Sequence, residues 1–181
     1  MQYLRLSAIV VLGAITVNAT AEVTDASANG FTLVHEVSVG ASRADAWAAA
    51  VHDVGNWWNP ARTISGNAEL LSIDARPLGC FCEAAGGGVV HLTVTWVSRN
   101  AILRMTGGLG PLGLMGVNGN MTWEFSDDDS GTKVKFFYAV GGYSAGGLDS
   151  IAGAVDVVIG EALHRLKAYI ETGDANNANG G

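Results

Sequence analysis

The chain has 181 residues, of which 49% are hydrophobic and 15% charged, and its 10 basic and 17 acidic residues give a formal net charge of −7. So apolar a chain can bury enough surface to offset the entropy lost on folding, which excludes a disordered protein. The acidic balance excludes a nucleic-acid binder, because such a protein needs a basic surface against the phosphates. The length fits one domain of ordinary size.

Residues 1–21 have the layout of a secretory signal peptide. Arg5 precedes an apolar run from Leu6 to Val17, and small residues follow up to Ala21. A basic start, an apolar core of about 7–15 residues and an A-x-A site are the parts of such a peptide. The run is shorter than the ~20 residues that span a bilayer, so we expect cleavage after Ala21, with a retained anchor as the alternative. The cleaved protein would be exported to the periplasm or the extracellular space, with no stable membrane anchor.

The rest of the chain is expected to form a single folded unit. Residues 22–30 are interpreted as an N-terminal lead-in, residues 31–172 as the folded domain and residues 173–181 as a disordered tail. The tail has no apolar periodicity, and such segments fray at the ends of domains. No internal repeat or linker divides the domain.

The domain is expected to begin with a strand and two short helices. Apolar and polar residues alternate over 31–39, which predicts a half-buried strand. Ser42 and Asp45 form a capping box before a helix over 44–51. A second helical turn is expected before Pro60, because proline cannot continue a helix.

The next part of the chain has the pattern of an antiparallel sheet. Short apolar or alternating runs follow one another with tight, glycine-rich turns between them. Parallel pairing would need long crossovers, so these strands are expected to pair with opposite directions. The predicted strands are 68–74, 79–84, 89–98, 101–106, 119–126 and 132–140.

A long helix is expected to close the domain. Apolar residues recur at three- and four-residue spacing from Ile151 to Ile170, which predicts about five helical turns with a stop near Gly173. Asp156, His164 and Lys167 fall on the opposite, polar side of this helix.

The segment from Gly107 to Gly119 is the one long connection of the predicted sheet. It is apolar, yet rich in glycine and proline. A loop of this length commonly has a function, so it is interpreted either as a lid over a cavity or as a loop whose Leu and Met side chains cap the core.

Six short motifs punctuate this order of elements: Ala46-Trp47, Asn56–Pro60, Thr63–Gly66, Arg76–Glu83, Gly108–Leu112 and Val140–Tyr143. Together with the element order they resemble the SRPBCC superfamily, the START-like or polyketide cyclase-like group, over nearly all of 31–171. The resemblance implies an α+β helix-grip fold. In that fold a curved antiparallel sheet of about six or seven strands wraps around a long C-terminal helix, with two short helices after the first strand and an apolar cavity between sheet and helix. Members bind lipids, hormones or polyketides, and some catalyse cyclisation or dehydration. The superfamily shares no catalytic motif, so no catalytic residue is carried over, and no cofactor is expected.

Aromatic and sulfur-containing side chains are the candidate ligand-binding residues. Most of them alternate along the predicted strands on the face that would meet the C-terminal helix, and three, Trp57, Trp58 and Tyr143, are expected at the mouth. They could line an apolar pocket or fill a solid core, and the resemblance favours the pocket. The expected ligand-binding residues are Trp57, Trp58, Met105, Trp123, Phe136, Tyr138 and Tyr143.

Three polar residues are weak candidates for acid–base chemistry. The hairpin at Gly86–Gly88 would place either Glu83 or Cys82 opposite His91, depending on its register, and a Glu–His pair can act as a general base. The uniformly apolar face of that strand is Val90, Leu92, Val94 and Trp96, however, so His91 is expected on the solvent side. His35 shares a face with apolar neighbours and is expected in the core or the cavity, where a lone histidine is more often a satisfied core residue.

Cys80 and Cys82 are the two cysteines of the chain. Export favours a disulfide, but residues i and i+2 of an extended strand lie ~6.5–7 Å apart, at the limit for a bridge. Two buried thiols are therefore expected. A zinc site with His91 would lack both the C-x2-C spacing and a fourth ligand, so no metal is expected.

The favoured interpretation is an exported binding protein for a small hydrophobic ligand of lipid, polyketide or aromatic type. An enzyme that uses His35, Glu83 or His91 in the same cavity is the first alternative, and a protein–protein interaction module is the second. Whether the protein is an enzyme, and its oligomeric state, are left open by the sequence.

Overall fold

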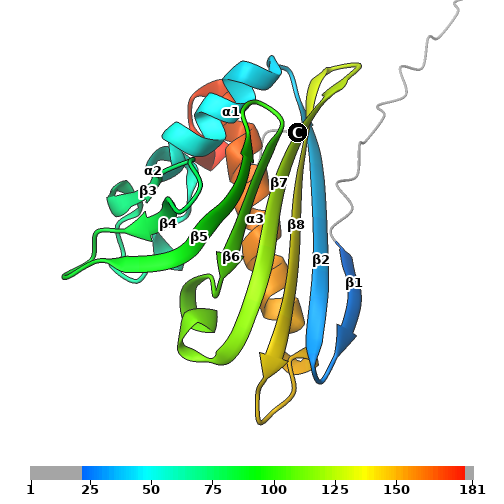
Figure 1. Ribbon diagram of the computed structural model, residues 1–181. Helices are drawn as coiled ribbons and strands as arrows, with labels where there is room; N and C mark the ends of the chain where they lie inside the picture. The colour runs from blue at the N-terminus through cyan, green and yellow to red at the C-terminus, as the bar shows by residue number, and fades with distance from the viewer. Residues whose placement is uncertain (1–21, 178–181) are drawn as a thin grey trace, which may run out of the picture.

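The computed structural model describes residues 22–177 and shows an eight-stranded antiparallel sheet that curves around one long helix (Figure 1). The segment interpreted as a signal peptide, 1–21, lies outside the described residues. The strands stand in the order β1-β2-β8-β7-β6-β5-β4-β3. Their bounds are β1 Glu22–Ser27, β2 Gly30–Val39, β3 Leu71–Ile73, β4 Cys80–Glu83, β5 Val89–Ser98, β6 Ile102–Gly107, β7 Gly116–Asp128 and β8 Gly131–Tyr143.

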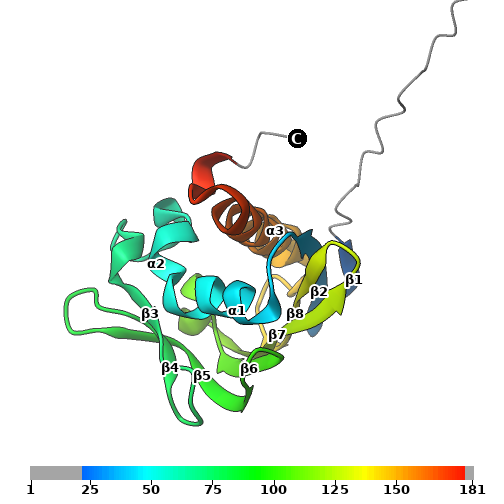
Figure 2. The ribbon, with the colours of Figure 1, turned by 90° about the horizontal axis from the view of Figure 1, so that it is seen from above.

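The helices lie on the concave side of this sheet, as the view from above shows (Figure 2). They are α1 Arg43–His52, α2 Val54–Trp57 and α3 Asp149–Thr172, with the 3-10 turns η1 Pro60–Arg62, η2 Ala68–Leu70, η3 Gly110–Leu114 and η4 Ala175–Asn177. Within residues 22–177, no helix combines the length and the apolar character needed to cross a membrane.

The predicted α+β class and antiparallel sheet are confirmed, but the sheet has eight strands rather than six or seven. The additional strand is β1, which lies in the segment interpreted as a lead-in, 22–30, and pairs antiparallel with β2. Most of its side chains are exposed. An edge strand held by backbone hydrogen bonds needs no apolar face, so it leaves no alternating pattern in the sequence.

The predicted helices are confirmed together with their ends. The Ser42 hydroxyl caps α1 by accepting a hydrogen bond from the Asp45 amide, 3.2 Å away. Gly173 ends α3 in the left-handed conformation, at φ 77°, and its amide donates to the Tyr169 carbonyl. The helical turn expected before Pro60 is α2.

Part of the segment expected to be a disordered tail, 173–181, packs against α3. The η4 turn buries Ala175, which is 3% exposed, and the side-chain Oδ1 atom of Asn176 accepts a hydrogen bond from Arg165 at 3.0 Å. This turn is attached to α3 by one small apolar residue and one polar contact. So few contacts leave no pattern in the sequence, which is why the turn could not be predicted. Residues 178–181 lie outside the described part of the chain.

Candidate functional site

The inner face of the sheet carries side chains in rows that cross the strands. Phe136 on β8 pairs with His35 on one side and with Trp123 on the other. The adjacent row passes through Leu33, Tyr138, Met121, Met105 and Val94. Because paired residues share a face, these rows place His35 among aromatic and sulfur-containing neighbours.

Aromatic rings from three strands of the sheet and from the C-terminal end of α2 form one cluster inside the molecule. Trp123 stacks on Phe136 with ring centroids 4.4 Å apart. It also lies 6.0 Å from Trp57 and 6.4 Å from Phe81, and Trp58 packs edge-on against Phe81 at 5.4 Å. This aromatic cluster, which consists of Trp57, Trp58, Phe81, Trp123 and Phe136, fills the region between the sheet and the helices.

All the predicted ligand-binding residues except Tyr143 are buried in this interior. Trp57, Met105, Trp123 and Tyr138 are 0% exposed, so they border no space that water can enter. Tyr143 lies at the end of β8 and is 76% exposed, apart from the others. The aromatic interior is therefore filled in this structure, and a ligand would have to displace part of its wall.

One polar atom of the aromatic cluster lacks a partner. The indole Nε1–H of Trp123 is buried and, among residues 22–177, finds no hydrogen-bond acceptor. Native proteins pair nearly all buried donors, so such an atom needs an explanation.

Glu83 and His91 form a buried pair at the edge of this cluster. The Glu83 Oε2 and His91 Nε2 atoms lie 3.0 Å apart, and the two side chains are 0% and 5% exposed. The His91 ring also packs edge-on against Phe81, with centroids 5.8 Å apart. The expectation that His91 lies on the solvent side is therefore wrong.

A β-bulge turns His91 inward. Cys82 pairs with Val90 and Phe81 pairs with Leu92, so His91 is the extra residue, and neither Glu83 nor Cys82 lies directly opposite it as either expected register would require. A bulge re-aims a side chain in this way, and here two consecutive residues, His91 and Leu92, point into the core.

A second bulge farther along β5 reverses the alternation again. The pairing shifts between Val94 and Trp96, and Trp96 turns outward, where it is 44% exposed and stacks against the Arg104 guanidinium. Val90 is 63% exposed, so only Leu92 and Val94 of the expected apolar face are buried. The alternation along this strand therefore predicts the wrong side for His91, because two apolar residues, Val90 and Trp96, are exposed while the histidine is buried.

Glu83 is held in its charged form by the loop before η2. Burial alone raises the pKa of its carboxyl, but hydrogen bonds from Ser65, from the Ile64 amide and from His91 outweigh this and lower the pKa from 4.5 to about 2. The Ile64 amide donates to Oε2 at 3.1 Å, and the Ser65 amide donates to Oε1. The carboxylate is therefore fixed by backbone donors on one side and by His91 on the other.

The hydrogen bonds of His91 define its tautomer. Its Nδ1 accepts a hydrogen bond from the Gly110 amide at 3.3 Å, and an amide can only donate. The ring proton is then on Nε2, where it donates to the charged Glu83 carboxylate. His91 is thus a neutral imidazole whose basic nitrogen faces the Gly107–Gly119 segment.

Tyr138 is the second anchor of that segment. Its hydroxyl accepts a hydrogen bond from the Leu109 amide at 3.2 Å and donates to the Gly107 carbonyl at 3.3 Å. Burial raises the pKa of this hydroxyl, which keeps it protonated and able to donate. Its ring lies against Gly119, where an added Cβ would come within 2.5 Å of it.

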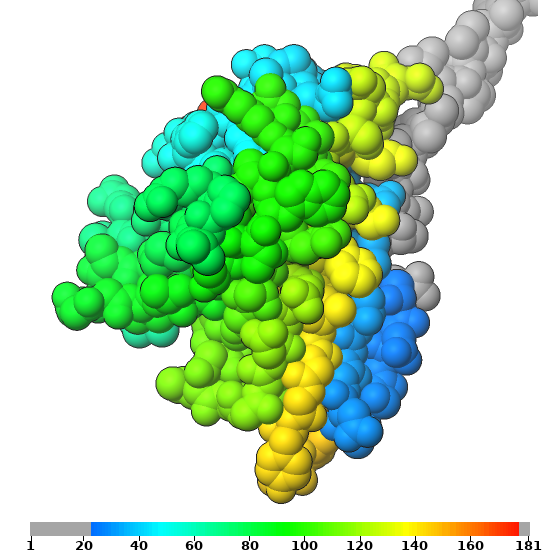
Figure 3. Space-filling model, in the orientation of Figure 1, coloured from blue at the N-terminus to red at the C-terminus, as the bar shows by residue number. Residues whose placement is uncertain are grey.

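The Gly107–Gly119 segment covers this end of the interior. It forms η3 and lies beside the end of β8, since Gly116 pairs with Tyr143 (Figure 3). Leu112 is buried at 4% exposure, whereas Leu114 is 93% exposed. Leu109, Met115 and Val117 of the segment are partly buried against the core, and residues 116–119 belong to β7 and pair in the sheet. The part between the strands, 108–115, fully buries one residue, Leu112, and makes the hydrogen bonds to Tyr138 and His91.

His35 belongs to a second histidine–carboxylate pair. Its Nε2 lies 2.7 Å from Asp156 Oδ1, and the two side chains are 3% and 19% exposed. The ring fits against Gly160 of α3, where an added Cβ would lie 2.8 Å from the His35 Cε1 atom. The expected burial of His35 is confirmed, while Asp156, expected on the polar side of the helix, turns toward the sheet.

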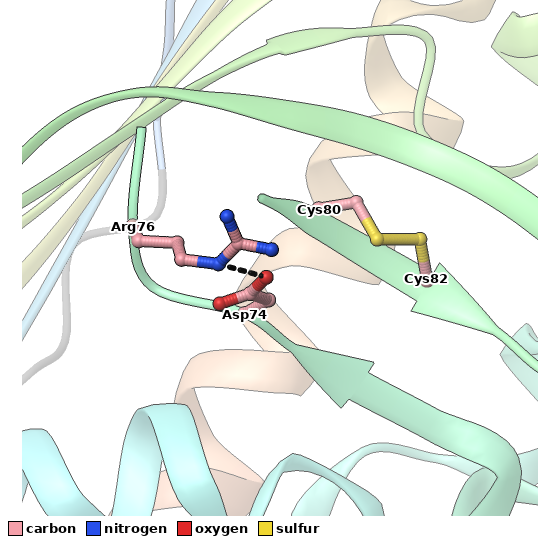
Figure 4. Close-up of a disulfide and its surroundings, with 4 residues drawn as sticks. All are labelled: Asp74, Arg76, Cys80 and Cys82. Carbon is pink, nitrogen blue, oxygen red and sulfur yellow. Dashed lines mark ion pairs between the residues drawn. A yellow bond between two sulfur atoms is a disulfide. The ribbon is translucent and has the colours of Figure 1, made fainter. Parts of the chain in front are cut away.

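Cys80 and Cys82 form a disulfide on β4, which Figure 4 shows beside the ion pair of Asp74 and Arg76. The expectation of two free thiols is wrong. Their Cα atoms are 5.4 Å apart, closer than in a fully extended strand and within the range for a bridge. The bridge spans Phe81, which points into the aromatic cluster.

One hollow of about 220 Å³ lies on the surface near α1 and the turn after β5. Its lining is Trp47, His52, Ala75, Val97 and Arg99, and none of the predicted site residues belongs to it.

Sequence reasoning missed the groups that complete the two pairs. Asp156 sits at a helical position that reads as polar and exposed, and the backbone donors of Ile64, Ser65 and Gly110 have no side-chain signature. The motifs Thr63–Gly66 and Gly108–Leu112, which contributed to the family resemblance, were the signal that these loops matter.

No protein-family model matches this chain, and no curated protein matches it in sequence. Solved structures do match. An uncharacterised protein from Rhizobium leguminosarum is 21% identical over 85% of this chain and 98% of its own, with a TM-score of 0.55. CalU16 from Micromonospora echinospora is 14% identical over 83% of each chain, with a TM-score of 0.50. DynU16, from the dynemicin biosynthetic locus, is 17% identical over 80% of this chain but 48% of its own, with a TM-score of 0.56. These likenesses concern the fold alone, and the curved antiparallel sheet with its C-terminal helix fits the helix-grip architecture.

Proposed function

We propose that the protein is an exported SRPBCC-like protein that binds a small, largely apolar ligand between the sheet and α3. The observation that carries the proposal is the unpartnered Nε1–H of Trp123 within the aromatic cluster. A ligand in contact with this cluster would supply the missing acceptor.

The surroundings of Trp123 define the chemistry of this ligand. Its neighbours are the rings of Trp57, Phe81 and Phe136, which favour a flat, aromatic or polyketide-like molecule. The indole donor favours a carbonyl or ether oxygen on that molecule. One of the structural neighbours belongs to a biosynthetic locus, which is compatible with such a ligand.

The part of the Gly107–Gly119 segment that lies between the strands, 108–115, is the part of the wall that can move at the lowest cost. It fully buries one residue, Leu112, while Leu109 and Met115 are only partly buried, and hydrogen bonds to Tyr138 and His91 hold it. Gly107 and Gly110 adopt positive φ angles, 143° and 57°, which a glycine changes with little strain. Segments with few apolar contacts open with the smallest free energy, so the ligand would pass beneath this one.

Export is supported by the disulfide as well as by residues 1–21. Disulfides persist in oxidising compartments and are rare in the cytosol. The Cys80–Cys82 bridge therefore suits a protein of the periplasm or the extracellular space.

Binding of two aromatic probes tests the proposal. We expect 2-acetylnaphthalene, which carries a carbonyl acceptor, to bind the wild-type protein about fivefold more tightly than naphthalene, because one hydrogen bond contributes about 1 kcal/mol. Trp123→Phe retains an aromatic ring but lacks the donor, so it should abolish this preference while naphthalene still binds. Isothermal titration calorimetry measures both affinities. If neither probe binds, or if the preference survives in Trp123→Phe, the proposal is wrong.

A further inference from the structure

We infer that His91 accepts a proton from the bound ligand, that Glu83 is its positioning residue, and that the Gly107–Gly119 segment masks this base until the ligand arrives. The inference rests on the proposed function and adds to it a reaction class, proton abstraction within the apolar interior.

The hydrogen bonds around His91 leave one nitrogen for chemistry. Nε2 carries the proton that binds the Glu83 carboxylate, 3.0 Å away, so the lone pair is on Nδ1. A neutral imidazole that is oriented by a carboxylate behind it is the arrangement of a general base, because the carboxylate stabilises the imidazolium that forms. The carboxylate is fixed in turn by the Ile64 and Ser65 amides.

The partner of Nδ1 is exchangeable. The Gly110 amide lies 3.3 Å from Nδ1, the long end of the range for a hydrogen bond, and it belongs to η3, which buries a single residue, Leu112. When this segment moves aside to admit a ligand, Nδ1 loses its donor. A weakly acidic group of the ligand then takes the place of the Gly110 amide.

His91 also lies within reach of the ligand region. Its ring packs against Phe81, whose ring packs in turn against Trp123. A ligand whose carbonyl oxygen accepts from Trp123 would extend along Phe81 toward His91. The substrate class is therefore an aromatic or polyketide-like carbonyl compound with an acidic C–H bond.

The proposed step needs no further reactant. The ligand C–H bond breaks, its proton forms a new N–H bond at His91 Nδ1, and the electron pair moves to the oxygen of the carbonyl beside that C–H bond, a carbonyl other than the one that accepts from Trp123. The product is an enolate beside an imidazolium. The Glu83 carboxylate balances the imidazolium charge until the proton returns to another atom of the ligand.

A benzisoxazole probe tests this base without knowledge of the natural ligand. In 5-nitrobenzisoxazole, removal of the C3 proton breaks the ring N–O bond and releases a coloured nitrophenolate in one step. We expect saturable turnover by the wild-type protein and a loss of at least about 100-fold in kcat for His91→Gln, the usual size of a general-base contribution. Glu83→Gln should lower kcat by roughly 10- to 100-fold with little change in KM, because orientation and charge are lost while the binding surface stays. His35→Gln is the matched control and should leave turnover unchanged.

Two further measurements make every outcome decisive. Quenching of tryptophan fluorescence reports whether the probe binds at all. Binding without His91-dependent turnover overturns the inference and leaves the proposed function standing. Absence of binding overturns both. Hydrogen exchange of the wild-type protein needs no variant. We expect saturating 2-acetylnaphthalene to increase exchange at the Gly110 amide at least about fivefold, because the ligand takes the place of this amide at His91 Nδ1. Unchanged exchange at the Gly110 amide with the ligand bound would overturn the inference.

Discussion

The two histidine–carboxylate pairs of this protein are built from the same groups but held in different ways. His35 and Asp156 join β2 to α3, and the His35 ring is fitted against Gly160 of the same helix. Glu83 and His91 lie on neighbouring strands at a bulge, and both side chains are almost completely buried.

The difference lies in what surrounds each pair. Asp156 is partly open to solvent, so water can satisfy its remaining oxygen, and the pair fixes helix against sheet. Glu83 has backbone donors from a loop on both oxygens, and His91 is covered by a second loop. A buried charge that is oriented by one loop and masked by another is costly as a structural device, whereas such a group is typical of sites that act on a ligand.

The largest effect that separates the two pairs is expected on removal of their carboxylates. Glu83→Ala leaves the buried His91 Nε2–H and the part-buried Ile64 and Ser65 amides without their acceptor, which costs about 3–5 kcal/mol of the free energy of unfolding. Asp156→Ala leaves only His35 without its partner, and water can reach the place of Asp156, which is 19% exposed, so this change should cost about 1–2 kcal/mol. Urea denaturation with the disulfide intact measures both. Equal losses would mean that the two pairs play the same structural part.

Much of this fold could be predicted because its regular elements follow simple periodicities. The apolar spacing between Ile151 and Ile170 predicts α3, the capping residue Ser42 marks the start of α1, and the alternation over 31–39 predicts β2. β1 could not be predicted, because an exposed edge strand is specified by the backbone of its neighbour rather than by its own side chains.

The candidate site could be predicted only in part, because it lies where the periodicity breaks. Glu83 and His91 were recognised as potential partners, yet one extra residue in β5 reverses which side chains are buried. The exposed Val90 and Trp96 are as apolar as the buried Leu92 and Val94, so composition does not reveal the bulge. Backbone donors such as that of Gly110 carry no sequence signal, so the cover over His91 was visible only as a glycine-rich loop.

A smaller effect is expected from the pH dependence of stability. The pKa of Glu83 is lowered from 4.5 to about 2 in the folded protein, so its hydrogen bonds contribute fully above about pH 4.5 and are lost as the pH falls toward 2. The unfolding free energies of the wild type and Glu83→Gln should therefore differ by a constant amount above pH 5 and converge in acid. The pKa of Asp128 is also lowered to about 2, but this residue is present in both proteins, so its contribution cancels in the difference between the two unfolding free energies. Thermal unfolding between pH 2 and 7 measures the difference, and parallel curves in acid would contradict the assignment.

The smallest effect, and the one that bears most directly on the cover, is expected for Tyr138→Phe. The hydroxyl holds the Leu109 amide and the Gly107 carbonyl, so its removal should cost about 1 kcal/mol and increase hydrogen exchange at the Leu109 amide by about fivefold. Tyr169→Phe is the matched control, because the Tyr169 hydroxyl contacts Asn56 and Asp53 instead.

Exchange at the backbone around His35 should be unchanged in both variants, since that pair joins β2 to α3. If the Gly107–Gly119 segment is the route into the interior, Tyr138→Phe should also bind 2-acetylnaphthalene with a faster association rate, which stopped-flow fluorescence measures. Unchanged exchange at Leu109 together with an unchanged association rate would mean that the segment is a fixed part of the core, and that His91 is as permanently enclosed as His35.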